Sequence, residues 1–122
     1  MNIHFYHCKS CDSFFVKTGA PTEFQCGNDV LKPLEANTSD GAKEKHVPVV
    51  SHEGDTLHVQ VGSVLHPMLE EHYIQWIALV TEKGYEVHYL NPGDVPATDF
   101  ADVEHGTVYE YCNLHGLWKT EF

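Results

Sequence analysis

After about residue 46 the chain shows short runs in which apolar and polar residues alternate, the pattern of strands with one buried face. Leu57, Val59 and Val61 are separated by polar residues, and Tyr73–Thr81 is a longer run that is richer in apolar residues. The pattern predicts strands at Val47–Ser51, Thr56–Val64, Tyr73–Thr81, Tyr85–Leu90, Thr107–Cys112 and Leu117–Glu121.

Turn residues separate these runs. Glu53-Gly54-Asp55 and Glu82-Lys83-Gly84 are short enough for hairpins, and Asn91-Pro92-Gly93-Asp94 opens a long loop. No segment has a convincing helical period. Several short strands with frequent turns indicate an antiparallel sandwich or barrel.

The hairpins also predict where three histidines lie. If the first hairpin turns at Glu53-Gly54-Asp55, His46 and His66 lie together at its opposite end. His72 precedes the second hairpin and is tied to His66 by a short loop, so we expect all three at one end of the fold. The pattern does not place Cys112.

A ligand set for a metal follows from these residues and the turn Cys112-Asn113-Leu114-His115-Gly116. One soft sulfur with several imidazole nitrogens suits a redox-capable transition metal. Four histidines and a cysteine are one ligand too many for a closed tetrahedral zinc site, whereas five ligands with an open position suit iron. We interpret the remaining histidines as structural or surface residues: His4, His7, His52, His58, His88 and His105.

Composition narrows the class of protein. A chain of 122 residues with 42% hydrophobic residues fits one packed domain plus a small appendage. Its net charge of -11, with seven lysines and no arginine, argues against a nucleic-acid partner. A negative field would repel a small anionic substrate, so a lysine beside the site gains importance.

The expected compartment is the cytoplasm. No apolar run is long enough to span a bilayer, so no membrane association is expected, and the first residues lack the features of a signal peptide. Four cysteines in a cytosolic chain indicate metal or redox use more than disulfides.

A small, polar stretch around Glu35–Ala42 reads as a linker. It predicts a division into residues 1–36, which hold Cys8, Cys11 and Cys26, and residues 37–122, the main domain. The first part is too small to form a stable core without a cross-link such as a bound metal or a disulfide.

Five motifs resemble those of the superoxide reductases, in particular the desulfoferrodoxins. They are Glu44-Lys45-His46-Val47-Pro48, Gly62-Ser63-Val64-Leu65-His66-Pro67-Met68, Glu71-His72-Tyr73-Ile74-Gln75-Trp76, Asn91-Pro92-Gly93-Asp94 and Tyr111-Cys112-Asn113-Leu114-His115-Gly116-Leu117-Trp118. The resemblance extends over essentially the whole chain and implies an all-β, immunoglobulin-like antiparallel β-sandwich with a small desulforedoxin-like piece at its amino terminus.

The resemblance further implies a mononuclear iron (Fe2+/Fe3+) with His46, His66, His72 and His115 as equatorial ligands and Cys112 as the axial ligand. The implied reaction is the one-electron reduction of superoxide to hydrogen peroxide without release of dioxygen. The implied partners are superoxide, a protein electron donor such as a rubredoxin, and a second copy of the chain in a homodimer.

The same resemblance assigns catalytic roles to two charged neighbours. Lys45 would attract the anion and hold a proton-donating water, and Glu44 would bind the sixth position when the iron is ferric. Without the resemblance, both residues would be interpreted as a solvated charge pair. The rival functions are an iron-dependent electron carrier or redox sensor with the same ligands and, more remotely, a structural zinc protein.

The amino-terminal piece departs from the family. Desulforedoxin-like sites use a Cys-x-x-Cys and an adjacent Cys-Cys pair, but Gln25 stands where the first cysteine of that pair belongs. We favour loss of this second iron or zinc site, because affinity in so small a unit depends on the full ligand set. Two alternatives remain open: a metal held by three cysteines and a water or His7, or a disulfide between Cys8 and Cys11.

Overall fold

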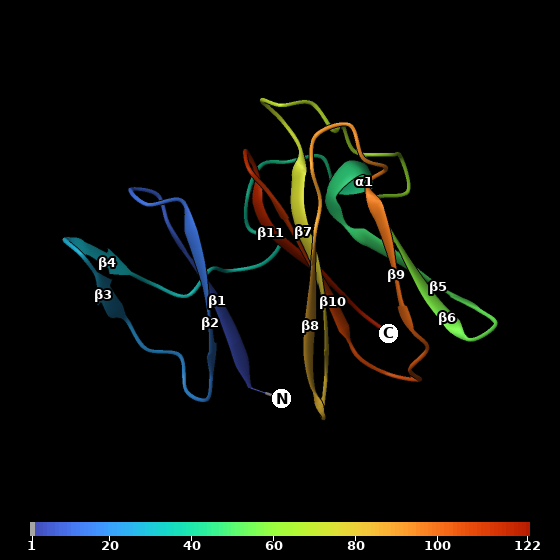
Figure 1. The fold of residues 1–122 in the computed structure, drawn as a ribbon, viewed down its shortest axis with the longest axis horizontal. Helices are drawn as coiled ribbons and strands as arrows, with labels where there is room; N and C mark the ends of the chain where they lie inside the picture. Colours follow the sequence, from blue (N-terminus) through green and yellow to red (C-terminus); the bar gives the residue numbers. More distant parts are fainter. Residues whose placement is uncertain (1) are drawn as a thin grey trace. The chain divides into compact units, whose positions relative to one another are not determined.

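A computed structural model describes residues 2–122 (Figure 1). The chain contacts divide it into a smaller unit that ends at Glu35 and a larger unit, Ala36–Phe122. The sequence division into two domains stays a prediction, because compactness alone does not show that either part folds by itself. Among the described residues, no helix is long and apolar enough to cross a membrane.

The larger unit is an immunoglobulin-like antiparallel β-sandwich, which confirms the expected fold class. One sheet has the strand order β11-β10-β7-β8 and the other β5-β6-β9. The bounds are β5 Pro48–Glu53, β6 Thr56–Val61, β7 Ile74–Thr81, β8 Gly84–Tyr89, β9 Ala97–Ala101, β10 Thr107–Cys112 and β11 Gly116–Glu121.

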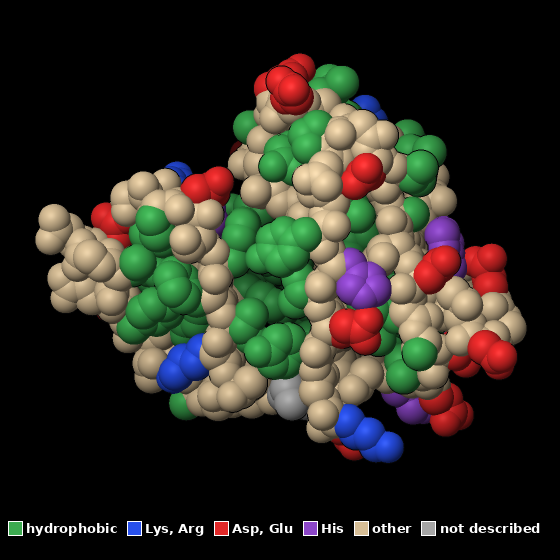
Figure 2. Space-filling model, viewed as in Figure 1, with side chains coloured by type: hydrophobic (Ala, Val, Ile, Leu, Met, Phe, Trp, Pro, Cys, Tyr) green, Lys and Arg blue, Asp and Glu red, His purple; other side chains and the backbone are tan. Residues whose placement is uncertain are grey.

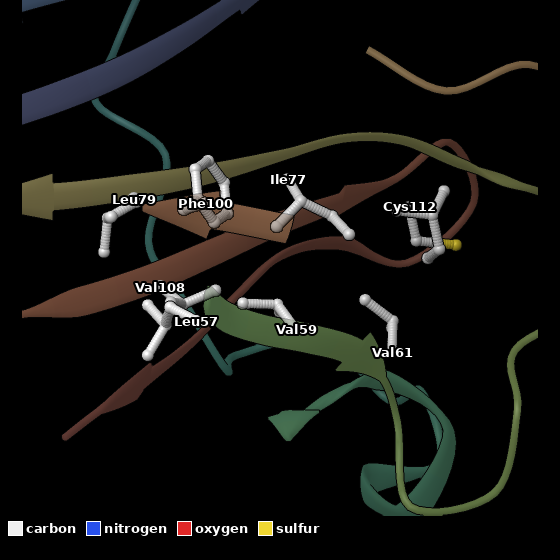
Figure 3. Close-up of a cluster of buried hydrophobic side chains, with 9 residues drawn as sticks. Leu57, Val59, Val61, Ile77, Leu79, Phe100, Val108 and Cys112 are labelled. Carbon is white, nitrogen blue, oxygen red and sulfur yellow. The ribbon is translucent and has the colours of Figure 1, made fainter. Parts of the chain in front are cut away.

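The core lies between the two sheets and follows the alternation in the sequence. Leu57, Val59 and Val61 of β6 are fully buried and pack with residues of the facing sheet (Figure 3). Cys112 lies at one end of this cluster, with its sulfur directed away from Ile77. The core therefore ends at the thiol expected to bind metal.

Three local details differ from the sequence prediction. The strand predicted to reach Val64 ends at Val61, and the long loop contains a further strand, β9, in which only Phe100 is fully packed inside. A single helical turn, α1 (Lys43–His46), precedes β5, closed by a hydrogen bond from Val47 N–H to Lys43 O of 2.9 Å.

The smaller unit consists of two hairpins. β1 (Ile3–Cys8) pairs with β2 (Ser13–Thr18), and β3 (Phe24–Cys26) pairs with β4 (Asp29–Leu31). Its core is correspondingly small: Tyr6, Cys8 and Leu31 are buried, with Phe15, Phe24 and Cys26 against them.

Candidate metal centre

Five side chains converge at one end of the sandwich. Their possible ligand atoms all lie within 4.8 Å of one another, and they belong to His46, His66, His72, Cys112 and His115. These are the five residues that the sequence singled out, and Figure 1 shows α1 and the loop between β6 and β7 at the same end of the fold. Their roles as metal ligands remain a proposal.

His46 and His66 are fixed in orientation by backbone carbonyls. His46 Nδ1 lies 2.7 Å from Ala42 O, and His66 Nδ1 lies 2.7 Å from Pro67 O. Because a carbonyl oxygen only accepts, each Nδ1 must carry the ring proton, and each Nε2 is left with its lone pair.

Those two lone pairs face each other, since the Nε2 atoms of His46 and His66 are 3.2 Å apart. Two acceptors at this distance repel unless a cation lies beside both. Ligands at right angles around an ion, each at the usual metal–nitrogen distance of about 2.1 Å, would be about 3 Å apart. The pair therefore fits two adjacent metal ligands.

His72 offers a further buried nitrogen that a metal could bind. Its Nε2 is buried and has no hydrogen-bond partner among the described residues, although buried polar atoms are almost always satisfied. Cys112 Sγ lies 3.5 Å from His66 Nε2 and 3.8 Å from His115 Nδ1, which completes the cluster. Five donors of this kind suit a mononuclear iron better than a four-coordinate zinc.

Burial keeps three of the imidazoles neutral. It lowers the pKa of His66 to about 4 and also lowers the pKa values of His46 and His72, so these rings are unprotonated near pH 7. Burial raises the pKa of the Cys112 thiol, while hydrogen bonds from the backbone of Leu114 and His115 oppose that shift. A bound cation would favour the thiolate.

The turn that carries Cys112 and His115 is shaped by its backbone. Gly116 has φ +77°, a left-handed conformation that glycine adopts without strain, and it closes the three-residue turn between β10 and β11. The His115 carbonyl accepts hydrogen bonds from the Ser39 hydroxyl and from Trp118 Nε1–H. The Trp118 ring also stacks on His46, with centroids 5.0 Å apart.

The structure adds residues whose importance the sequence did not reveal. Asn113 links this turn to the segment bearing His72, through hydrogen bonds to Tyr73 and Glu71. Gly41 belongs to the stretch interpreted as a linker, yet a Cβ on it would lie 2.9 Å from His46 Cε1. The only signals in the sequence were an asparagine in a turn and a glycine in a polar stretch.

Glu44 and Lys45 have exposed side chains beside the cluster, on α1. Their backbone is held by the start of the loop that leads to His66, because Glu44 O accepts hydrogen bonds from Val64 N–H (2.8 Å) and Ser63 Oγ–H (3.2 Å). The positive charge of Lys45 contributes to lowering the pKa values of His46 and His72.

Several histidines outside the cluster bind acidic or polar neighbours. The ring nitrogens of His52 and His58 lie 2.7 and 2.6 Å from Asp102 and Asp99. His88 contacts Glu86 and Thr98, each at 2.7 Å. In Figure 2 the histidines on the visible face lie beside acidic side chains. His52 is exposed and His58 and His88 are half-buried, which agrees with their interpretation as structural or surface residues.

The sequence and fold of this chain are similar to those of known proteins. The family model described as Desulfoferrodoxin matches residues 38–121, which include all five residues of the cluster. The chain belongs to the desulfoferrodoxin family. A desulfoferrodoxin from Syntrophotalea carbinolica is 45% identical over 122 residues, covering 98% of this chain and 96% of the relative.

Two further similarities extend the family assignment. A desulfoferrodoxin from Clostridium acetobutylicum is 47% identical over 103 residues, covering 84% of this chain and 82% of the relative. The crystal structure of a superoxide reductase from Treponema pallidum has a TM-score of 0.84 at 39% identity, and the match covers 98% of this chain and 99% of that one. The fold is thus shared over both units of the chain.

Proposed function

We propose that this desulfoferrodoxin-family protein is a superoxide reductase. It reduces superoxide by one electron, with two protons, to hydrogen peroxide, and it releases no dioxygen. The superoxide reductases among its relatives and structural neighbours support this class of oxidoreductase. The observation that carries the proposal is the cluster of four imidazoles and one thiol, with the lone pairs of His46 and His66 facing each other and His72 Nε2 unsatisfied.

The proposed ligands of the iron are His46, His66, His72, His115 and Cys112. When bound, iron cycles between the ferrous and ferric states and supplies the electron. The burial of Cys112 keeps water from its sulfur, so the thiolate can donate electron density to the metal. Burial lowers the pKa values of His46, His66 and His72, so these three imidazoles present nitrogen lone pairs without first losing a proton.

Lys45 is proposed to act on the substrate. The chain has a net charge of -11, which repels a small anion, so a local ammonium beside the cluster is needed to attract superoxide. Lys45 also holds a proton-donating water in this proposal. Glu44, its exposed neighbour, is proposed to bind the oxidised centre.

The remaining partners stay predictions of the same proposal. Reduction of superoxide consumes electrons, so a protein donor such as a rubredoxin must restore the ferrous state. A homodimer and a cytoplasmic location are likewise expected from the sequence alone.

Three measurements on the purified protein test the proposal. We expect about one iron at the main cluster, a visible thiolate-to-iron charge-transfer band that is lost in Cys112→Ser, and consumption of superoxide by the reduced protein. Peroxide should form stoichiometrically, with no dioxygen evolved. An iron protein that exchanges electrons with a donor but reacts slowly with superoxide would instead be an electron carrier, and zinc without iron would indicate a structural site.

A further inference from the structure

A second group of possible metal ligands lies in the smaller unit. The thiols of Cys8, Cys11 and Cys26 all lie within 4.8 Å of one another, and the Sγ atoms of Cys11 and Cys26 are 3.9 Å apart. All three are free thiols in the structure. Cys8 is buried against the small core, whereas Cys11 is exposed, so the group opens to solvent on one side.

Two residues that the sequence connects with the fourth-ligand position, Gln25 and His7, contact groups other than the three thiols. Gln25, which stands in place of a cysteine, donates from Nε2 to Gly27 O at 3.0 Å. His7, the alternative from the sequence, has its Nε2 3.0 Å from Asp12 Oδ1. Neither contact directs the side chain to the three thiols.

Asp29 lies beside one of the three thiols, outside the group whose ligand atoms all lie within 4.8 Å of one another, so its carboxylate would have to turn toward Cys11 and Cys26 to join them. Its Oδ2 lies 3.5 Å from Cys8 Sγ, and the Cys8 thiol donates a hydrogen bond to it. Ser10 Oγ–H donates to the same oxygen at 2.6 Å and is 3.3 Å from Cys8 Sγ. A cation could take the place of the thiol proton between Cys8 and Asp29 while Ser10 continues to orient the carboxylate.

We propose that Cys8, Cys11, Cys26 and Asp29 form a second metal site, which binds zinc in a tetrahedral set of three thiolates and one carboxylate oxygen. Zinc accepts sulfur and carboxylate ligands together and is almost always four-coordinate and tetrahedral in structural sites. Binding transfers the three thiol protons to solvent, and no electron moves. This inference is independent of the function proposed for the larger unit.

The size of the smaller unit gives a reason for such a site. Its core cluster has three buried side chains, those of Tyr6, Cys8 and Leu31, a small number to hold a unit of this length. A metal that joins β1, the loop after it, β3 and β4 would connect both hairpins. The loss of one cysteine is then compensated by a carboxylate from the neighbouring strand.

Zinc affinity of the full-length, iron-loaded protein tests the proposal, by competition with a chromophoric zinc chelator. Cys26→Ser should weaken the tightest zinc site about 100-fold or more, and Asp29→Asn about tenfold or more. The matched control is Asp12→Asn, which removes the same charge in the same unit and should change the affinity less than about twofold. The five residues of the main cluster are unchanged in every variant.

Asp29→Cys separates a ligand from a structural residue. If Asp29 occupies the fourth position, a thiolate there should hold zinc at least as tightly as the wild-type protein does, although it no longer accepts the Ser10 hydrogen bond in the same way. A purely structural Asp29 would make both Asp29 variants equally weak. That result would overturn the proposal. So would a wild-type protein that binds zinc no more tightly than Cys26→Ser does, or an Asp29→Asn variant whose zinc affinity equals that of the wild type.

Discussion

Asn113 and Tyr73 are joined by two hydrogen bonds: Asn113 Oδ1 accepts from Tyr73 N–H at 3.0 Å, and Asn113 N–H donates to Tyr73 O at 3.2 Å. Asn113 Nδ2 also donates to Glu71 O at 3.1 Å. One side chain thereby fixes the turn that carries Cys112 and His115 against the backbone on either side of His72.

Removal of this side chain should loosen the metal centre without removing a ligand. We expect Asn113→Ala to weaken iron binding about tenfold or more, because the backbone that aims three ligands is no longer held. Competition with an iron chelator measures this change. Leu114→Ala is the matched control, since Leu114 lies in the same turn and its side chain is 60% exposed. Equal affinities in the two variants would show that Asn113 has no positioning role.

The convergence of three histidines could be predicted because it depends only on hairpin register. Once the turn at Glu53-Gly54-Asp55 is recognised, strand pairing places His46 and His66 at the opposite end, as the structure confirms. The position of Cys112 could not be predicted in the same way. The alternation places Cys112 at the end of a strand, but it does not determine at which end of the sandwich that strand terminates. Only the family resemblance placed it beside the histidines.

Contacts made by irregular backbone could not be predicted in this way. Asn37, with φ +62°, pairs with Leu117 and Lys119 of β11, so the stretch interpreted as a linker follows the edge of a sheet. The approach of Gly41 to His46 depends on that path. Similarly, the sequence pattern did not predict strand β9, because Phe100 is the one buried residue of that strand. Neither segment has a hydrophobic period to reveal its place.

Gly41 offers a direct test of the close approach. A Cβ at this position would meet His46 Cε1 at 2.9 Å and His115 Cβ at 3.1 Å, so Gly41→Ala should displace the two imidazoles. We expect a shifted thiolate-to-iron band and a loss of stability of about 1–3 kcal/mol in chemical unfolding. Asp40→Ala, at the preceding, exposed position, serves as a control for substitution in this segment. An unaltered spectrum in Gly41→Ala would exclude the contact.

Lys45 should determine the rate of encounter with superoxide. We expect Lys45→Ala to slow the bimolecular reaction about tenfold and to flatten its dependence on ionic strength, because a local attraction is lost from an acidic protein. Lys45→Arg should retain most of the rate. Pulse radiolysis over a range of salt concentrations measures both quantities. Lys43→Ala, on the same helical turn, is the control, and a rate equal to that of this control would remove Lys45 from the mechanism.

Glu44 should affect the oxidised state instead of the encounter. In Glu44→Ala the rate of the first reaction with superoxide should stay within about twofold of wild type, because no positive charge is lost. The absorption spectrum of the ferric resting protein should shift, since the proposed carboxylate ligand is gone. Glu82→Ala, in the turn between β7 and β8, is a control for the change of net charge. Identical ferric spectra in the two variants would argue against the proposed role.

Glu110 is an unusual residue of the sandwich core. It is fully buried on β10, and both of its carboxyl oxygens lack a hydrogen-bond partner among the described residues. Burial raises its pKa well above the usual value, so the native protein keeps this carboxyl protonated to a higher pH than the unfolded chain does. A buried polar group without partners costs stability, by about 1–3 kcal/mol in typical proteins.

Glu110→Met should therefore stabilise the metal-free protein, and by more at about pH 8 than at about pH 5. Below the unfolded pKa of about 4.3, both states of the wild type are protonated. As the pH rises above that value, only the unfolded chain releases the proton, so wild-type stability falls until the native pKa is passed, whereas the methionine variant has no such loss. Urea unfolding across this range measures the difference, with Glu82→Gln as the exposed control. A stabilisation independent of pH would mean that Glu110 titrates alike in both states, and destabilisation at every pH would mean that its oxygens have partners in solution.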